Sequence, residues 1–102
     1  MTEDRVLVLY VPTKRRDEFV DVLMGCEALS GFSLLPALGY SREHSHFNTR
    51  EQVVGYRRFD RFEIFLAEAD LSVLLEKLGH ASGRERLRYW IHDCSEDGHL
   101  PS

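Results

Sequence analysis

The chain has 102 residues, of which 43% are apolar and 29% charged, and its formal net charge is −4. A chain of this length is expected to form one domain, here residues 1–102. The negative charge argues against general nucleic-acid binding, which requires a basic surface. The first apolar run is too short for a signal peptide or a membrane span, and two cysteines make no disulfide framework. We therefore expect a cytoplasmic protein that does not insert into membranes.

The first half of the chain predicts a strand, a helix and a second strand. Residues 6–11 form a continuous apolar run typical of a central strand. Thr13 is the expected N-cap of a helix that starts at Lys14. Residues 31–39 read as the second strand, in which Pro36 indicates an edge position or a bulge. The helix has one apolar stripe at helical spacing, made by Phe19, Val20, Val22, Leu23, Cys26 and Leu29.

The second half repeats this order. Residues 58–66 alternate between apolar and polar side chains, as in a strand with two different faces. Asp70 is the expected cap of a second helix, with an apolar face of Leu71, Leu74, Leu75 and Leu78. Residues 87–92 read as the fourth strand, and residues 99–100 as a short additional strand. The order βαββαβ predicts a ferredoxin-like α+β sandwich, a fold that does not by itself indicate a function.

A long polar insert separates the second and third strands. Residues 40–57 exceed the roughly 12–15 residues beyond which loops are uncommon and usually functional or disordered. The insert contains several charged and polar side chains, namely Arg42, Glu43, His44, His46, Asn48, Arg50 and Glu51. We therefore expect it to engage something outside the chain.

These segments resemble the PII-like superfamily, which includes nitrogen-regulatory PII and CutA-type proteins. The resemblance rests on Gly-Phe-Ser to Leu-Gly-Tyr in residues 31–40, and on Glu-Gln-Val-Val-Gly-Tyr-Arg-Arg in residues 51–58. Residues 67–70 (Ala-Glu-Ala-Asp) and 88–91 (Arg-Tyr-Trp-Ile) are similar to a subfamily often encoded beside heavy-metal efflux pumps. The resemblance implies a homotrimeric regulator whose residues 40–57 correspond to the partner-binding T-loop, and a membrane metal transporter as a possible partner.

The chain departs from nucleotide-binding PII proteins before the fourth strand. Those proteins have a glycine-rich loop there, whereas residues 81–88 contain one glycine and offer fewer backbone amides to an anion. ATP or ADP binding in the usual PII manner is therefore doubtful. Arg84, Arg86 and Arg88 can hold a phosphate or can be solvated. The candidate ligand- and partner-binding residues are Arg42, Glu43, Arg50, Arg57, Arg58, Arg84 and Arg88.

Two pairs of residues have the chemistry of metal ligands. His44 and His46 can face the same way on extended backbone and chelate one ion, although a structural zinc site needs four ligands. His92 and Cys94 would share a strand face and suit a soft or borderline ion. The alternatives are a polar loop that tolerates histidine, and a partly buried cysteine at a strand end.

A basic group near the third strand contains Arg50, Arg57, Arg58 and Arg61. It can dock an acidic segment or hold an anion at the base of the insert. A solvated sheet face, with ion pairs to Glu51, Asp60 and Glu63, explains it equally well. Lys14, Arg15 and Arg16 oppose the dipole of the first helix, which indicates either another task or, more simply, a solvated turn.

The first hypothesis is a PII-like regulator that binds a small ligand and a partner through residues 40–57. In its trimer three sheets would face inward and cover apolar and aromatic surface. The alternative is a metal sensor or buffer that uses the loop histidines, with a transition metal as its ligand. An enzyme is not expected, because the sequence has neither a phosphate loop nor a group that orients Cys94 and His92 for catalysis.

Overall fold

The computed structural model describes residues 3–40 and 55–101, and it forms one antiparallel sheet with two helices. The strands are β1 (Arg5–Pro12), β2 (Phe32–Gly39), β3 (Arg57–Leu66) and β4 (Tyr89–Asp93), in the order β2-β3-β1-β4. The helices are α1 (Arg16–Met24) and α3 (Leu71–Ser82), preceded by the 3-10 turns η1 (Thr13–Arg15) and η3 (Glu68–Asp70). This small α+β arrangement is consistent with the predicted ferredoxin-like fold.

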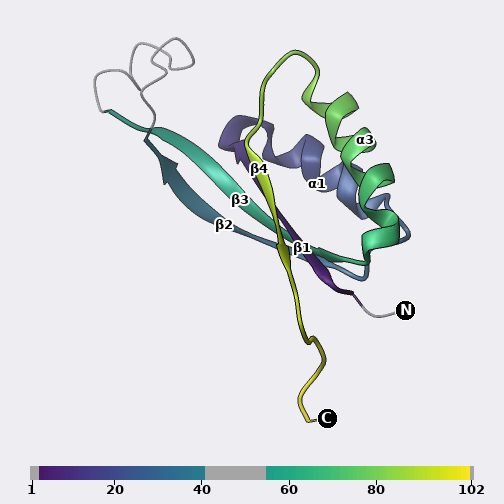
Figure 1. Cartoon of the computed structure of the whole chain (residues 1–102). Helices are drawn as coiled ribbons and strands as arrows, with labels where there is room; N and C mark the ends of the chain where they lie inside the picture. The colour runs from purple at the N-terminus through teal and green to yellow at the C-terminus, as the bar shows by residue number, and fades with distance from the viewer. Residues whose placement is uncertain (1–2, 41–54, 102) are drawn as a thin grey trace.

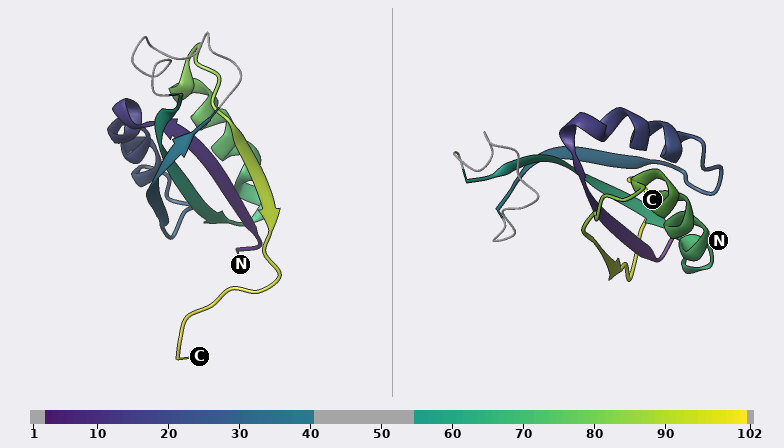
Figure 2. Two further views of the ribbon diagram at one scale, coloured as in Figure 1. Left: turned by 90° about the vertical axis from the view of Figure 1, so that its left-hand side faces the viewer. Right: turned by 90° about the horizontal axis from the view of Figure 1, so that it is seen from above.

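Both helices pack on the same face of the sheet (Figures 1 and 2). The alternation of β3 places Phe62, Ile64 and Leu66 on this face, where each is fully buried. They meet the buried side chains of α1 and α3, which include Phe19, Leu23, Leu74 and Leu78. The predicted apolar stripes of the two helices and the two-faced pattern of the third strand are therefore confirmed.

The positions of the strands follow from their sequences. β1 is flanked by β3 and β4, as its continuous apolar run predicts. Among the described strands β2 pairs only with β3, so Pro36 lies on an edge strand, where its missing N–H is tolerated. The prediction of an edge position for Pro36 is confirmed.

Several local predictions are wrong. Thr13 is not the N-cap of α1, because Thr13–Arg15 forms a separate 3-10 turn and the helix begins at Arg16 without a side-chain cap. Asp70 stands at the N-cap of α3, but its carboxylate makes no capping hydrogen bond. The fourth strand is Tyr89–Asp93, shifted from the predicted residues 87–92. Residues 99–100 form no strand, because the chain after β4 leaves the sheet (Figure 1).

Different elements lie at the two ends of the sheet. At the loop end β2 finishes and β3 starts, β1 finishes at η1, and β4 starts after α3 (Figure 1). At the opposite end lie the starts of β1 and α3 and the end of β4. No helix in the described residues is long and apolar enough to cross a membrane.

One carboxylate interrupts the buried face near the loop end. Asp60 is 3% exposed, and its Oδ2 makes no hydrogen bond. The nearest cation is the Nη1 of Arg16, the first residue of α1, at 4.0 Å. The Arg16 guanidinium thus places a positive charge next to this buried carboxylate.

We expect Phe62→Ala to lower the free energy of unfolding by about 3–5 kcal/mol, because it removes a fully buried ring and leaves a cavity. Val73→Ala is the control, since Val73 lies on α3, away from the open face of the sheet, and is 56% exposed. Urea unfolding of both variants measures the difference. Equal losses for the two variants would contradict this assignment of the core.

Candidate functional site

The long connection between β2 and β3 leaves and re-enters the sheet at neighbouring positions. Gly39, the last residue of β2, pairs directly with Arg57, the first residue of β3. The predicted candidates Arg42, Glu43, His44, His46 and Arg50 lie outside the described residues. The structure therefore describes the base of the loop, through Tyr40, Gly55, Tyr56 and Arg57.

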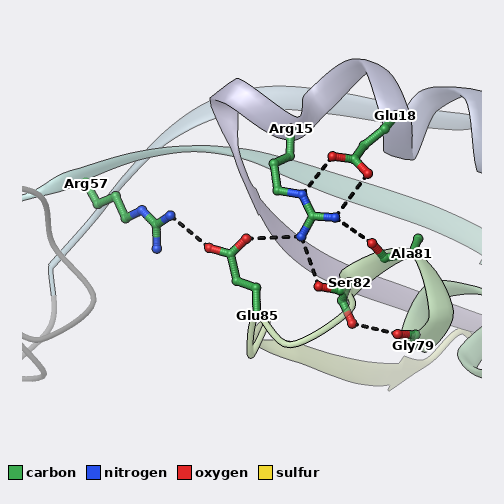
Figure 3. Close-up of polar contacts among 7 residues, drawn as sticks. All are labelled: Arg15, Glu18, Arg57, Gly79, Ala81, Ser82 and Glu85. Carbon is green, nitrogen blue, oxygen red and sulfur yellow. Dashed lines mark hydrogen bonds and ion pairs between the residues drawn. The ribbon is translucent and has the colours of Figure 1, made fainter.

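A partly buried network of ion pairs joins the base of the loop to both helices (Figure 3). The Glu85 carboxylate accepts a hydrogen bond from Arg57 Nη2 at 2.9 Å and another from Arg15 Nη1 at 3.1 Å. Arg57 belongs to β3, Arg15 to η1, and Glu85 to the connection between α3 and β4. One carboxylate thus links three segments that are far apart in sequence, and we call this the Glu85 network.

Arg15 extends the Glu85 network onto the end of α3. Its guanidinium donates to the backbone carbonyls of Ala81 and Ser82, and also forms a two-point pair with Glu18. The last carbonyls of a helix lack partners within the helix and attract cations. Arg15 therefore acts as a C-terminal cap of α3 supplied by another part of the chain.

The ionisation of these groups is mutually stabilised. Partial burial alone would raise the pKa of Glu85, but the hydrogen bonds and charges of Arg57 and Arg15 outweigh it and hold this pKa below its usual value. The hydrogen bond to Glu18 raises the pKa of Arg15 against its desolvation. The same bond lowers the pKa of Glu18. Arg15, Glu18 and Glu85 are therefore charged at neutral pH.

Aromatic rings pack beside the arginines at the loop base. The Arg57 guanidinium lies 5.4 Å from the centre of the Phe59 ring, and that ring lies so close to Gly39 that a methyl group there would overlap it. Tyr40 and Tyr56 face each other with ring centres 5.9 Å apart, and Arg58 lies over Tyr56. Gly39 is therefore required by close packing at the point where the loop begins.

The sheet face without helices carries an aromatic cluster. The Tyr10 ring lies 5.7 Å from Phe59 and 5.5 Å from Trp90, measured between centres. Arg61 and Arg88 both stack on Trp90. A hydrogen bond with Tyr10 raises the pKa of Arg61, which also pairs with Glu63 at 3.3 Å. The predicted pairing of Arg61 with Glu63 on the sheet is thus present.

The second predicted metal pair is engaged in other contacts. His92 Nε2 accepts a hydrogen bond from Trp90 Nε1 at 2.9 Å. Cys94 Sγ donates to the Glu96 carbonyl at 3.3 Å. Within residues 3–40 and 55–101, no group of three or more His, Cys, Asp or Glu side chains is placed to hold a metal ion. A metal at His92 and Cys94 would have to displace both bonds and find further ligands.

The remaining arginine candidates are separate from the Glu85 network. Arg84 and Arg88 are exposed in the connection that precedes β4, and Arg58 is exposed at the start of β3. Of the predicted ligand-binding arginines in the described residues, Arg57 alone contacts Glu85.

Sequence reasoning missed the two residues that complete the network. Arg15 was expected in a solvated turn, yet its side chain is only 19% exposed and holds the end of α3. No sequence pattern distinguishes Glu85, which is a single carboxylate in a polar connection. The unfavourable placement of Arg15 against its own helix dipole was the one available signal for Arg15.

The Glu85 network makes stability depend on pH. A carboxylate whose pKa falls on folding stabilises the fold above its unfolded pKa, near 4.5, and this contribution disappears as pH falls through the folded value. We expect Glu85→Gln to cost roughly 1 kcal/mol at neutral pH, a cost that shrinks in acid. Urea unfolding from about pH 7 to about pH 3 measures it.

The control for this measurement is Glu76→Gln, because Glu76 is exposed on α3 and has no ion pair among the described residues. Its difference from the wild type should stay small at every pH. A Glu85→Gln cost that does not change with pH would show that the carboxylate charge is not what stabilises the network.

Comparison with known proteins places the chain in a family. Residues 1–101 match the family described as "Protein of unknown function (DUF3240)". The chain is similar to a DUF3240 family protein from Shewanella baltica OS155, known from a crystal structure, with 36% identity and a TM-score of 0.81. That match covers 98% of this chain and 99% of the other.

A more distant likeness concerns the fold alone. A Bacillus cereus protein related to NIF3 matches with 14% identity and a TM-score of 0.71. The match covers 97% of this chain but only 27% of that one, so this chain spans about a quarter of that protein. No curated protein matches. On its full-length match and its 36% identical relative, the chain belongs to the DUF3240 family.

Proposed function

We propose that this protein is a PII-like regulatory binding module of the cytoplasm, rather than an enzyme. In this proposal it forms a homotrimer, binds a small ligand at the base of residues 40–57, and engages a partner protein through that loop. The resemblance to proteins encoded beside heavy-metal efflux pumps makes a membrane metal transporter the proposed partner.

The observation that carries this proposal is the double pairing of Glu85. Its carboxylate ties Arg57, where the loop re-enters the sheet, to Arg15, which caps α3. An anionic ligand that binds Arg57 competes with Glu85, because each guanidinium has few faces for a carboxylate or phosphate. Binding would then change the contacts of the loop base and of both helices together, as a regulator requires.

The open sheet face supports self-association. Leu35 and Phe65 are 44% and 40% exposed on that face, beside the cluster of Tyr10, Phe59 and Trp90. Aromatic and apolar side chains without a covering layer are typical of an interface. Three copies with their sheets facing inward would remove this surface from water.

The proposed small ligand is an anion. The connection before β4 has one glycine, Gly83, so a nucleotide held in the usual PII manner would find fewer backbone amides there. The arginines of the loop base offer charge instead. Direct binding of a transition metal by His44 and His46 is the alternative, and it rests on the sequence alone.

A thermal-shift panel tests the ligand proposal on purified, tag-free protein. The panel contains inorganic phosphate, ATP, ADP, AMP, cyclic nucleotides, Zn²⁺, Ni²⁺ and Cu⁺. A ligand at about 100 times its Kd stabilises the fold by about 2.7 kcal/mol and raises the Tm by several degrees. We expect an anion to give the shift, and Glu85→Gln to enlarge it by removing the competing carboxylate.

The panel also discriminates between the two functions. A shift with metal ions alone, which is lost in His44→Ala/His46→Ala and weakens as pH falls through the imidazole range, would replace the regulator with a metal sensor or buffer. A shift with an anion that is the same in wild type and Glu85→Gln would remove Glu85 from the binding step.

The assembly is tested by light scattering coupled to size-exclusion chromatography. We expect the mass of three 11.9 kDa chains at micromolar concentration. Phe65→Glu should weaken the assembly, because three buried charges would face one another. Val73→Glu is the control, since Val73 is 56% exposed on α3, away from the open face. A wild-type monomer would refute the trimer.

A further inference from the structure

The charges of this acidic protein are separated along its strands. Most of the described lysines and arginines belong to η1, to the starts of α1 and β3, and to the connection before β4. Figure 1 shows that these segments lie at the loop end. Their basic residues are Lys14, Arg15, Arg16, Arg57, Arg58, Arg84, Arg86 and Arg88. The opposite end is acidic, with Glu3, Asp4, Glu68, Asp70, Asp93, Glu96 and Asp97. One end of the molecule is therefore basic although the net charge of the chain is −4.

Part of this basic end is available to a partner. Lys14, Arg84 and Arg86 are exposed and make no ion pair or hydrogen bond within residues 3–40 and 55–101. Arg58 and Arg88 are exposed as well, and each lies over an aromatic ring. An anionic partner would supply these exposed cations with ion pairs that the described residues do not provide.

The loop end also carries the aromatic residues typical of protein interfaces. Tyr40 is 72% exposed, and its ring faces Tyr56, on which the Arg58 guanidinium lies. Tyrosine and arginine dominate the binding energy of protein–protein interfaces. This composition distinguishes the surface from a purely electrostatic one, which would need only lysines and arginines.

We propose that the loop end, and in particular Arg84, Arg86 and Arg58, binds an acidic segment of a protein partner. This inference rests on the proposed function, in which the partner approaches from the loop side, and it adds the chemistry of the partner. Arginine pairs with carboxylates in a two-point geometry, which suits Asp and Glu side chains. The acidic opposite end orients the molecule during the approach.

A protein segment fits this surface better than a membrane or a nucleic acid. Carboxylates are interspersed with the cations, since Asp17 and Glu18 are exposed in the first turn of α1 and Glu85 lies between Arg84 and Arg86. A continuous layer of phosphates would be repelled by these groups. A peptide can place its carboxylates at the arginines and avoid the acidic positions.

The test uses the full chain and a fluorescein-labelled oligoglutamate peptide, with binding followed by anisotropy. We expect the affinity to fall as salt is raised, because the pairs are exposed. Arg84→Gln/Arg86→Gln should weaken binding about tenfold, since each exposed pair contributes a few-fold. The melting temperature of this variant should stay near that of the wild type, because neither arginine has an ion pair with any described residue.

Single substitutions give the matched control. Arg86→Gln and Lys77→Gln each remove one exposed positive charge, but Lys77 lies in the middle of α3. We expect Arg86→Gln to weaken peptide binding several-fold and Lys77→Gln by less than about twofold. Equal effects would show that net charge, not this surface, governs binding, and would overturn the proposal.

Two further probes and one variant separate the possible failures. The two probes are vesicles containing phosphatidylserine and a single-stranded oligonucleotide. If either binds at least as tightly as the peptide, the choice of an acidic protein segment is overturned. A variant with residues 41–54 replaced by a short Gly-Ser turn tests the loop itself. If it loses peptide binding while Arg84→Gln/Arg86→Gln does not, the loop function stands and this inference fails. If neither variant changes binding, both fail.

Discussion

The one-sided covering of the sheet determines the rest of this structure. Each strand alternates its side chains, so two helices that bury Leu7, Phe62 and Ile64 on one face leave the alternate residues without a layer. Residues 3–40 and 55–101 contain no further helix or strand that covers that second face. The aromatic cluster around Trp90 is the consequence, and a binding surface or a subunit contact is the expected use of such a face.

The second structural feature is the connection of the long loop to the helices at one end of the strands. Because β2 and β3 are adjacent and antiparallel, a long insertion between them leaves their pairing intact, and its two ends meet at Gly39 and Arg57. The Glu85 network then connects this point with η1 and α3. A change at the loop base therefore has a short physical path to both helices, through charged hydrogen bonds rather than through the packed core.

Most of the fold was readable from the sequence because burial and periodicity are local signals. The apolar stripe through Phe19 and Leu23, the alternation of β3 and the edge position of Pro36 each follow from a few neighbouring residues. The errors lie at the ends of elements, where boundaries are hardest to read from sequence. Thr13 does not cap α1, and the end of α3 is satisfied by Arg15, a residue from the other helix region.

The sequence by itself determined the order βαββαβ, the unusual length of residues 40–57 and the presence of many arginines. It left open which arginines are paired, since ion pairs join residues that are distant in the chain. Only the tertiary structure decided that Glu85 links Arg57 to Arg15, and that the basic residues share one end of the sheet. The physical reason is that the periodicity of buried residues is a pattern of neighbouring positions in the sequence. Which charged residues pair depends instead on the folded topology, which brings distant residues together.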